Sequence, residues 1–193
     1  AVICAVNLHW GYVELEKELE KLTGLTVKAG NDANVAALGE AWKGAAAGSS
    51  DVIMVTLGTG VGGGIIIDGK PLVGAHGAGG EIGHALVVRG EEEKCNCGNH
   101  GCLEVMISEQ ALKNRIPEFG QIPSLSALSE ITFSDLGKAA TFRDPTALAM
   151  VKEMAWELSI ALSNLISTVN PSLIVLGGKI PDLGEYFLNE VRE

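Results

Sequence analysis

Two kinds of hydrophobic pattern alternate along the chain, and together they predict a mixed α/β domain. Apolar residues recur every three or four positions, with polar residues between them, in segments expected to be helices; these are 13–22, 33–43, 108–116, 134–140, 145–169 and 183–193. Shorter apolar runs predict buried strands; these are 1–6, 25–29, 52–57, 65–68, 85–88 and 173–176. Such an α/β domain is expected to bind its ligand at the carboxyl ends of the strands.

Turn and cap residues are expected to set the ends of these elements. Gly24 should end the first helix, and Asp144-Pro145 should open the longest one. Asp68-Gly69 predicts a tight hairpin. Ser134 is well placed to cap the helix that follows it, and the Pro- and Ser-containing segment 117–130 is expected on the surface.

Three glycine-bearing turns, at 30–32, 58–60 and 177–178, each follow an apolar run directly. Backbone at such turns can approach a ligand closely and present N–H groups to phosphate. The turn at 58–60 lies between two strands, so it is not a dinucleotide-binding fingerprint, and it lacks the lysine and hydroxyl of a Walker loop. From the residues alone, a plain tight turn explains it equally well.

Asp32 is a carboxylate in the first of these turns, next to the amide of Asn31. A carboxylate there can accept a proton from a sugar hydroxyl, and the amide can hydrogen-bond a neighbouring hydroxyl. Taken alone, an aspartate in this position is more often a plain helix N-cap, and either Asn31 or Asp32 could cap the helix at 33–43. Glu81, His84 and Glu104 add polar groups further along the chain.

Three cysteines fall within eight residues, at Cys95, Cys97 and Cys102, and His84 lies one short apolar run upstream. Three thiolates and one imidazole suit a closed tetrahedral zinc site. His100 lies inside the cluster and could replace His84 as the fourth ligand. A disulfide would leave an odd thiol, so we favour zinc over a disulfide or a chance cluster.

Charge and composition narrow the functional class. The net charge of −10 argues against a nucleic-acid backbone or an anionic membrane as partner. The chain has no run of 18 apolar residues and no visible signal peptide, and a zinc-type thiol cluster favours a reducing, cytoplasmic location. The chain starts within an apolar run and stops within a helical pattern, so we expect a fragment with material missing at both ends.

Six segments, taken in order, resemble the ROK family of sugar kinases and repressors. They are NLHW (7–10), NDANVAALGE (31–40), TLGTGVGGG (56–64), GGEIGH (79–84), CNCGNHGCLE (95–104) and NPSLIVLGG (170–178). The resemblance covers nearly the whole chain and implies the actin-like ATPase (ribonuclease H-like) fold, with two lobes around a cleft. It implies that residues 1–35 are the end of the small N-terminal lobe and that 36–193 are the large lobe, which carries the zinc knuckle.

The resemblance also assigns roles to residues. It implies that Asp32 is the catalytic base toward the sugar 6-hydroxyl, and it favours His84 over His100 as zinc ligand. The sugar would be bound by Asn31, Glu81, His84 and Glu104, structural zinc by His84, Cys95, Cys97 and Cys102, the phosphates of ATP by Gly58, Thr59 and Gly60, and its adenosine by Gly177 and Gly178. Mg²⁺ would accompany ATP, and a homodimer is expected.

NLHW is similar to the NLGW segment of ROK glucokinases, which favours glucose as the substrate. The alternatives are a kinase for N-acetylglucosamine, N-acetylmannosamine or fructose, and the sugar-sensing part of a ROK repressor, in which a helix-turn-helix would bind DNA. Two departures from the family pattern are expected to matter. The C-terminal helix that returns to the small lobe is cut short, and the family's first phosphate loop, Asp-x-Gly-Gly-Thr, is absent from these residues. Its absence puts the activity of the 193 residues on their own in doubt.

Overall fold

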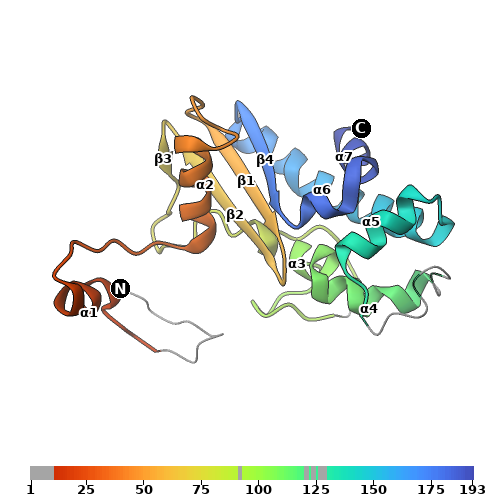
Figure 1. The fold of residues 1–193 in the computed structure, drawn as a ribbon, viewed down its shortest axis with the longest axis horizontal. Helices are drawn as coiled ribbons and strands as arrows, with labels where there is room; N and C mark the ends of the chain where they lie inside the picture. Colours follow the sequence, from red (N-terminus) through yellow and green to blue (C-terminus); the bar gives the residue numbers. More distant parts are fainter. Residues whose placement is uncertain (1–10, 91–92, 120–121, 123–124, 126–129) are drawn as a thin grey trace.

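The protein is a mixed α/β structure built on one four-stranded sheet (Figure 1). A computed structural model describes residues 11–90, 93–119, 122, 125 and 130–193. The strand order is β3-β2-β1-β4, and the strands are β1 (Val52–Leu57), β2 (Val61–Ile67), β3 (Lys70–Pro71) and β4 (Leu173–Gly178). The expected strand at 1–6 lies outside the described residues.

The pairing of the strands brings two of the glycine turns to one edge of the sheet. β1 and β2 form an antiparallel hairpin in which Leu57 lies opposite Val61, so the turn at 58–60 joins them directly. β1 and β4 are parallel, and Leu57 lies opposite Gly178. The carboxyl end of β4 therefore lies beside the start of the turn at 58–60, although the two are more than a hundred residues apart in sequence.

The alternation of side chains along β1 builds two separate cores. Ile53, Val55 and Leu57 point to the larger core, to which five helices contribute: α3 (Leu103–Ile107), α4 (Glu109–Phe119), α5 (Phe133–Thr141), α6 (Pro145–Val169) and α7 (Gly184–Arg192). Val52 and Met54 point to the opposite face, where they pack with Ala37 of α2 (Asp32–Lys43). A strand that is buried on both faces is expected to be almost continuously apolar, and this explains the sequence VIMVTL, in which only the partly buried Thr56 is polar.

The helices lie on both faces of the sheet, and α1 lies apart from it (Figure 1). Their bounds are α1 (Leu15–Thr23), α2 (Asp32–Lys43), α3 (Leu103–Ile107), α4 (Glu109–Phe119), α5 (Phe133–Thr141), α6 (Pro145–Val169) and α7 (Gly184–Arg192), with 3₁₀ turns η2 (Ile82–His84) and η4 (Ile180–Leu183). None of the residues of α1 is buried. The predicted domain boundary after residue 35 falls inside α2, and the division of the chain there stays a prediction.

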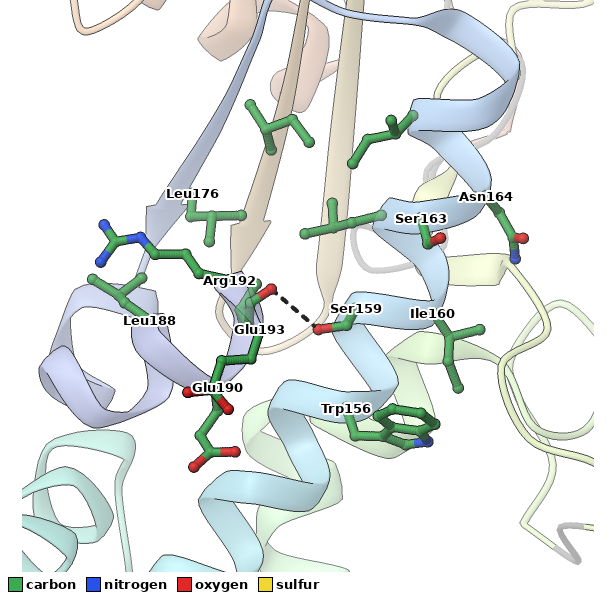
Figure 2. A pocket seen from close by; sticks show the side chains of 14 residues that line it. Trp156, Ser159, Ile160, Ser163, Asn164, Leu176, Leu188, Glu190, Arg192 and Glu193 are labelled. Carbon is green, nitrogen blue, oxygen red and sulfur yellow. Dashed lines mark hydrogen bonds between the residues drawn. The ribbon is translucent and has the colours of Figure 1, made fainter.

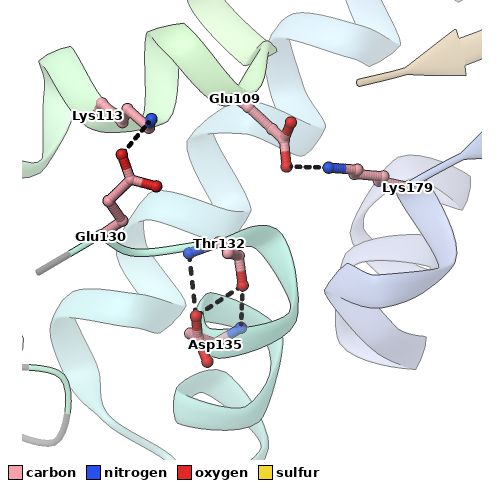
Figure 3. A network of polar contacts seen from close by, with 6 residues as sticks. All are labelled: Glu109, Lys113, Glu130, Thr132, Asp135 and Lys179. Carbon is pink, nitrogen blue, oxygen red and sulfur yellow. Dashed lines mark hydrogen bonds and ion pairs between the residues drawn. The ribbon is translucent and has the colours of Figure 1, made fainter. Parts of the chain in front are cut away.

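Most predicted helix ends and the hairpin are confirmed. Gly24 ends α1 in the left-handed conformation, and the Asp144 side chain accepts two backbone N–H bonds at the start of α6. Asp68 and Gly69 both have positive φ, as the two-residue hairpin turn requires. The cap of α5 differs from the prediction: Thr132, not Ser134, caps it, in a reciprocal capping box with Asp135 (Figure 3).

Three other expectations were wrong. Residues 25–29 form no strand, and the expected strand at 85–88 is reduced to a single bridge between Leu86 and Cys102. The segment 117–130 is not simply a surface loop, because α4 runs on to Phe119 and the side chains of Ile122 and Leu125 lie in the larger core.

Candidate active site and metal centre

A cavity of about 660 Å³ opens at the end of the sheet where β1 turns into β2. It gathers residues from four separate parts of the chain: the start of α2, the turn at 58–60, the residue before η2, and α3. The lining residues are Asn31, Asp32, Ala33, Ala36, Thr56, Leu57, Gly58, Thr59, Gly60, Val61, Gly62, Gly63, Glu81 and Glu104. Seven of the predicted sugar- and phosphate-binding residues therefore line one cavity: Asn31, Asp32, Gly58, Thr59, Gly60, Glu81 and Glu104.

At the start of α2, the residue that caps the helix is Asn31 and not Asp32. The Asn31 side chain caps the helix by accepting a bond from the backbone N–H of Asn34 at 3.1 Å. Asp32 is the first residue of the helix and accepts only from the N–H of the next residue, Ala33, at 2.8 Å among the contacts described. Asp32 is thus an exposed carboxylate beside the cavity, and the helix does not need it as its cap.

The turn at 58–60 is held in place by hydrogen bonds from two directions. Within the turn, the N–H of Gly58 donates to the carbonyl of Gly60 at 2.9 Å. The backbone N–H of Glu109, at the start of α4, donates to the Gly58 carbonyl at 3.0 Å. On the other side the Glu104 carboxylate accepts from the N–H of Val61 at 3.1 Å. The turn is therefore fixed relative to both α3 and α4.

Three other expected site residues, Gly177, Gly178 and His84, do not line this cavity. Gly177 and Gly178 end β4 beside β1, and a Cβ on Gly178 would lie 2.2 Å from the Leu57 carbonyl oxygen. Gly178 also has a φ of 66°, so the packing of the sheet requires glycine there whatever the ligand. His84, at the end of η2, is half-buried and faces the cysteines.

The predicted metal ligands come together. One ligand atom each from His84, Cys95, Cys97 and Cys102 lies within 4.8 Å of the others, and His100 is not part of this group. The Sγ atoms of Cys97 and Cys102 are 3.6 Å apart, and His84 Nδ1 is 3.4 Å from Cys95 Sγ. Tetrahedral zinc with bonds of about 2.3 Å to sulfur and 2.0 Å to nitrogen requires separations of roughly 3.5–3.8 Å. The four residues therefore fit a structural zinc ion.

The thiols in the cluster differ in acidity. Burial raises the pKa of Cys102 to about 12, and the other two thiols add to this effect. Cys97 is exposed, and the backbone N–H of Asn99 lowers its pKa below the ordinary value. Because a metal binds the thiolate, zinc would have to displace a proton from Cys102 at neutral pH.

A short helix joins the metal centre to the cavity. Cys102 is the residue before α3, and Glu104 is the second residue within it. The N–H of Leu103 donates to the Ala85 carbonyl at 2.9 Å, which ties the start of α3 to the residue after His84. Sequence reasoning placed Cys102 and Glu104 at the site but missed the helix that carries both, because it is only five residues long.

A second cavity, of about 840 Å³, lies between α6, α7 and β4 (Figure 2). Its walls are largely aliphatic, with Ile160 and Leu188 on facing helices. The Ser159 hydroxyl donates to the Ala155 carbonyl at 2.7 Å and lies 3.5 Å from the Val191 carbonyl. None of the predicted site residues lines it. The larger of the two cavities is therefore not where the candidate chemistry lies.

The fold and the site together define a sugar kinase-like protein of the actin-like ATPase class. The model of the ROK family matches residues 1–193, and the chain belongs to that family. It is 39% identical to a glucokinase of Halalkalibacterium halodurans over 98% of this chain. It is 36% identical to a xylose repressor of Caldicellulosiruptor bescii over 100% of this chain. The chain spans 59% and 49% of these two relatives.

Two solved structures show the same fold. A ROK family glucokinase from Streptomyces griseus, in complex with glucose and AMPPNP, is 37% identical and superposes with a TM-score of 0.81 over 99% of this chain and 64% of its own. A ROK family transcriptional regulator, a homologue of the E. coli MLC protein, is 30% identical with a TM-score of 0.90 over 99% of this chain and 49% of its own. Kinases and regulators are therefore both similar to this chain.

Among the helices in the described part of the chain, none combines the length and the apolar character needed to cross a bilayer. The expected cytoplasmic location and the expected homodimer stay predictions.

Proposed function

We propose that the protein is a ROK glucokinase, which transfers the γ-phosphoryl group of ATP to the 6-hydroxyl of glucose. The observation that carries this proposal is the shared cavity, which is lined by both the exposed carboxylate of Asp32 and the glycine turn at 58–60. A base for a hydroxyl and a set of backbone N–H groups for phosphate are the two components that phosphoryl transfer to a sugar needs.

In this proposal each site residue has a defined task. Asp32 accepts the proton of the 6-hydroxyl as that oxygen attacks the γ-phosphorus, and ADP leaves with the bridging oxygen. Asn31, Glu81, Glu104 and His84 bind the remaining sugar hydroxyls. The turn at Gly58, Thr59 and Gly60 holds the phosphates, and Gly177 and Gly178 lie beside the adenosine. Mg²⁺ bound with ATP would neutralise the phosphate charge.

The zinc ion would have a structural task. His84, Cys95, Cys97 and Cys102 would fill all four positions of a tetrahedral ion, which leaves none for substrate. With Nδ1 of His84 turned toward the cysteines, Nε2 is left to hydrogen-bond a sugar hydroxyl. The ion would therefore fix the orientation of a sugar-binding ring.

The test is Asp32→Asn in the intact protein, assayed by coupling ADP release to a dehydrogenase. Asparagine keeps the size of the side chain but cannot accept the proton, so we expect kcat for glucose to fall by on the order of 10² or more while the fold and the glucose affinity are retained. The unsubstituted protein is assayed in the same way with N-acetylglucosamine, N-acetylmannosamine, fructose and xylose in place of glucose. Near-normal turnover in the variant would exclude the role of base, and turnover with another sugar would reassign the substrate.

A second candidate function is sugar sensing in a ROK repressor. It is favoured by the similarity to the xylose repressor and to the transcriptional regulator. A sensor needs the sugar-binding residues but not phosphoryl transfer. If the intact protein binds a sugar, does not consume ATP, and releases an operator DNA when the sugar is added, this function replaces the kinase.

A further inference from the structure

The described residues that line the candidate site carry net negative charge, and none of them carries positive charge to balance the phosphates of ATP. Asp32, Glu81 and Glu104 are carboxylates, and none of the described residues that line the cavity is a lysine, an arginine or a histidine. A triphosphate brought into this space would meet negative charge on the protein. Backbone N–H groups and Mg²⁺ offset part of this repulsion, and a lysine or arginine close to the turn would offset more.

Lys179 lies at the right place. It follows Gly178 directly, and its backbone N–H donates to the Leu57 carbonyl at 2.8 Å, so its backbone is fixed next to the residue that precedes the turn. Its side chain reaches α4, where Nζ forms an ion pair with Glu109 Oε1 at 2.6 Å (Figure 3). Glu109 is the residue whose N–H bonds the Gly58 carbonyl. Lys179 is thus linked to the turn at 58–60 in two ways, by its backbone through Leu57 and by its side chain through Glu109.

The lysine side of the ion pair is open to water. The Lys179 side chain is 51% exposed and Glu109 is 20% exposed, so water screens the ammonium group more than it screens the carboxylate. Glu109 lies in the first turn of an 11-residue helix, where the helix dipole favours a carboxylate even without the lysine. The lysine stem is flexible, while its backbone is held by the bond to Leu57.

We infer that Lys179 is a nucleotide-binding residue that leaves Glu109 and binds a phosphate group of ATP when the nucleotide occupies the turn at 58–60. The inference rests on the proposed function, because it assumes that this turn holds phosphate. Glu109 holds the ammonium group beside the turn until the nucleotide arrives.

The experiment is calorimetry on the intact protein with Mg-ATP and with adenosine, which lacks the phosphates. Lys179→Met is expected to weaken Mg-ATP binding about tenfold or more, as the loss of one charged hydrogen bond predicts, and to leave adenosine binding unchanged. Lys179→Arg should restore most of the ATP affinity. Glu109→Gln releases the lysine, so ATP should bind as tightly as in the wild type or more tightly.

Lys113→Met is the matched control, because Lys113 of α4 also forms an ion pair with a glutamate, Glu130, at 3.1 Å, and neither residue lines the cavity (Figure 3). It should leave ATP binding unchanged. If Lys179→Met and Glu109→Gln weaken ATP equally, the pair only fastens β4 to α4 and the inference is wrong. Unchanged ATP binding in Lys179→Met would also overturn it. A wild-type protein that does not bind ATP at all would instead overturn the proposed function.

Discussion

Gly58 and Gly60 lie two residues apart in one turn, but only one of them has room for a side chain. A Cβ on Gly60 would lie 2.4 Å from Glu104 Oε2, so any substitution there would displace a proposed sugar-binding residue as well. A Cβ on Gly58 would have no atom within 4 Å, and its φ does not demand glycine. Gly58 is therefore the position at which an added side chain affects only what enters the cavity.

We expect Gly58→Val to weaken ATP binding at least about tenfold and to leave glucose binding within about twofold, because the added methyl groups would occupy the space of a phosphate. The measurement is calorimetry with each ligand in the intact protein. Gly60→Val serves as the comparison and should weaken both ligands, since it meets Glu104. If Gly58→Val binds ATP normally, the turn at 58–60 only reverses the chain.

At the scale of elements, a buried ion pair fastens α3 to the rest of the larger core. Arg115 of α4 donates to the Met106 carbonyl of α3 at 2.8 Å and pairs with Glu157 of α6 at 2.7 Å. Both of these charged side chains are almost fully buried, and Glu153, which is half exposed, pairs with the other guanidinium nitrogen at 2.8 Å. α3 carries Glu104, so this pair helps to hold in place a helix that lines the cavity.

Glu157→Ala should lower the free energy of unfolding by about 3 kcal/mol or more, because it leaves Arg115 buried with its main partner removed. Glu153→Ala removes a more exposed partner of the same arginine and should cost about 1 kcal/mol or less. Urea denaturation of both variants measures the difference. Equal, small losses would show that the buried pair contributes no more than an exposed one.

The elements that the sequence predicted well are those with a local cause. α2 and α6 have a cap side chain and a long apolar face, and the β1–β2 hairpin lies between two apolar runs. The wrong predictions depend on distant contacts. The run at 85–88 is apolar because Val87 and Val88 pack against the larger core, and not because the run joins the sheet; the N–H of Val87 donates to the Gly101 carbonyl instead. α3 is too short for a periodic signal and depends on Arg115, nine residues further along from Met106.

At the scale of the whole molecule, the site depends on which strands are neighbours. The motif residues were recognisable one by one from their resemblance to a family, but only the parallel pairing of β1 with β4 shows that Lys179 and the turn at 58–60 are adjacent. No sequence pattern in the chain encodes that pairing, because α6 and three other helices separate the two strands. The sheet thus supplied the one proposed site residue that the motifs missed.

The last prediction is that the metal centre and the sugar-binding residues of the cavity are coupled through α3. Cys102 and Glu104 flank the start of α3, and His84 faces the cysteines, so loss of zinc should loosen the sugar-binding wall of the cavity. The turn at 58–60 keeps its bond from α4 and should be affected less. Cys97→Ala should therefore raise the KM for glucose about tenfold or more and change the KM for ATP much less.

Metal analysis and steady-state kinetics on the intact protein test this coupling. The wild type should contain about one zinc per chain if the four ligands are as assigned. Zinc should be lost as the pH falls, because protons compete for the thiolates and burial already raises the pKa of Cys102. His84→Ala should lose zinc as Cys97→Ala does, whereas His100→Ala should keep it, because His100 lies outside the four-ligand group. Full activity in a metal-free protein would refute the coupling, and loss of zinc only in His100→Ala would move the fourth ligand to His100.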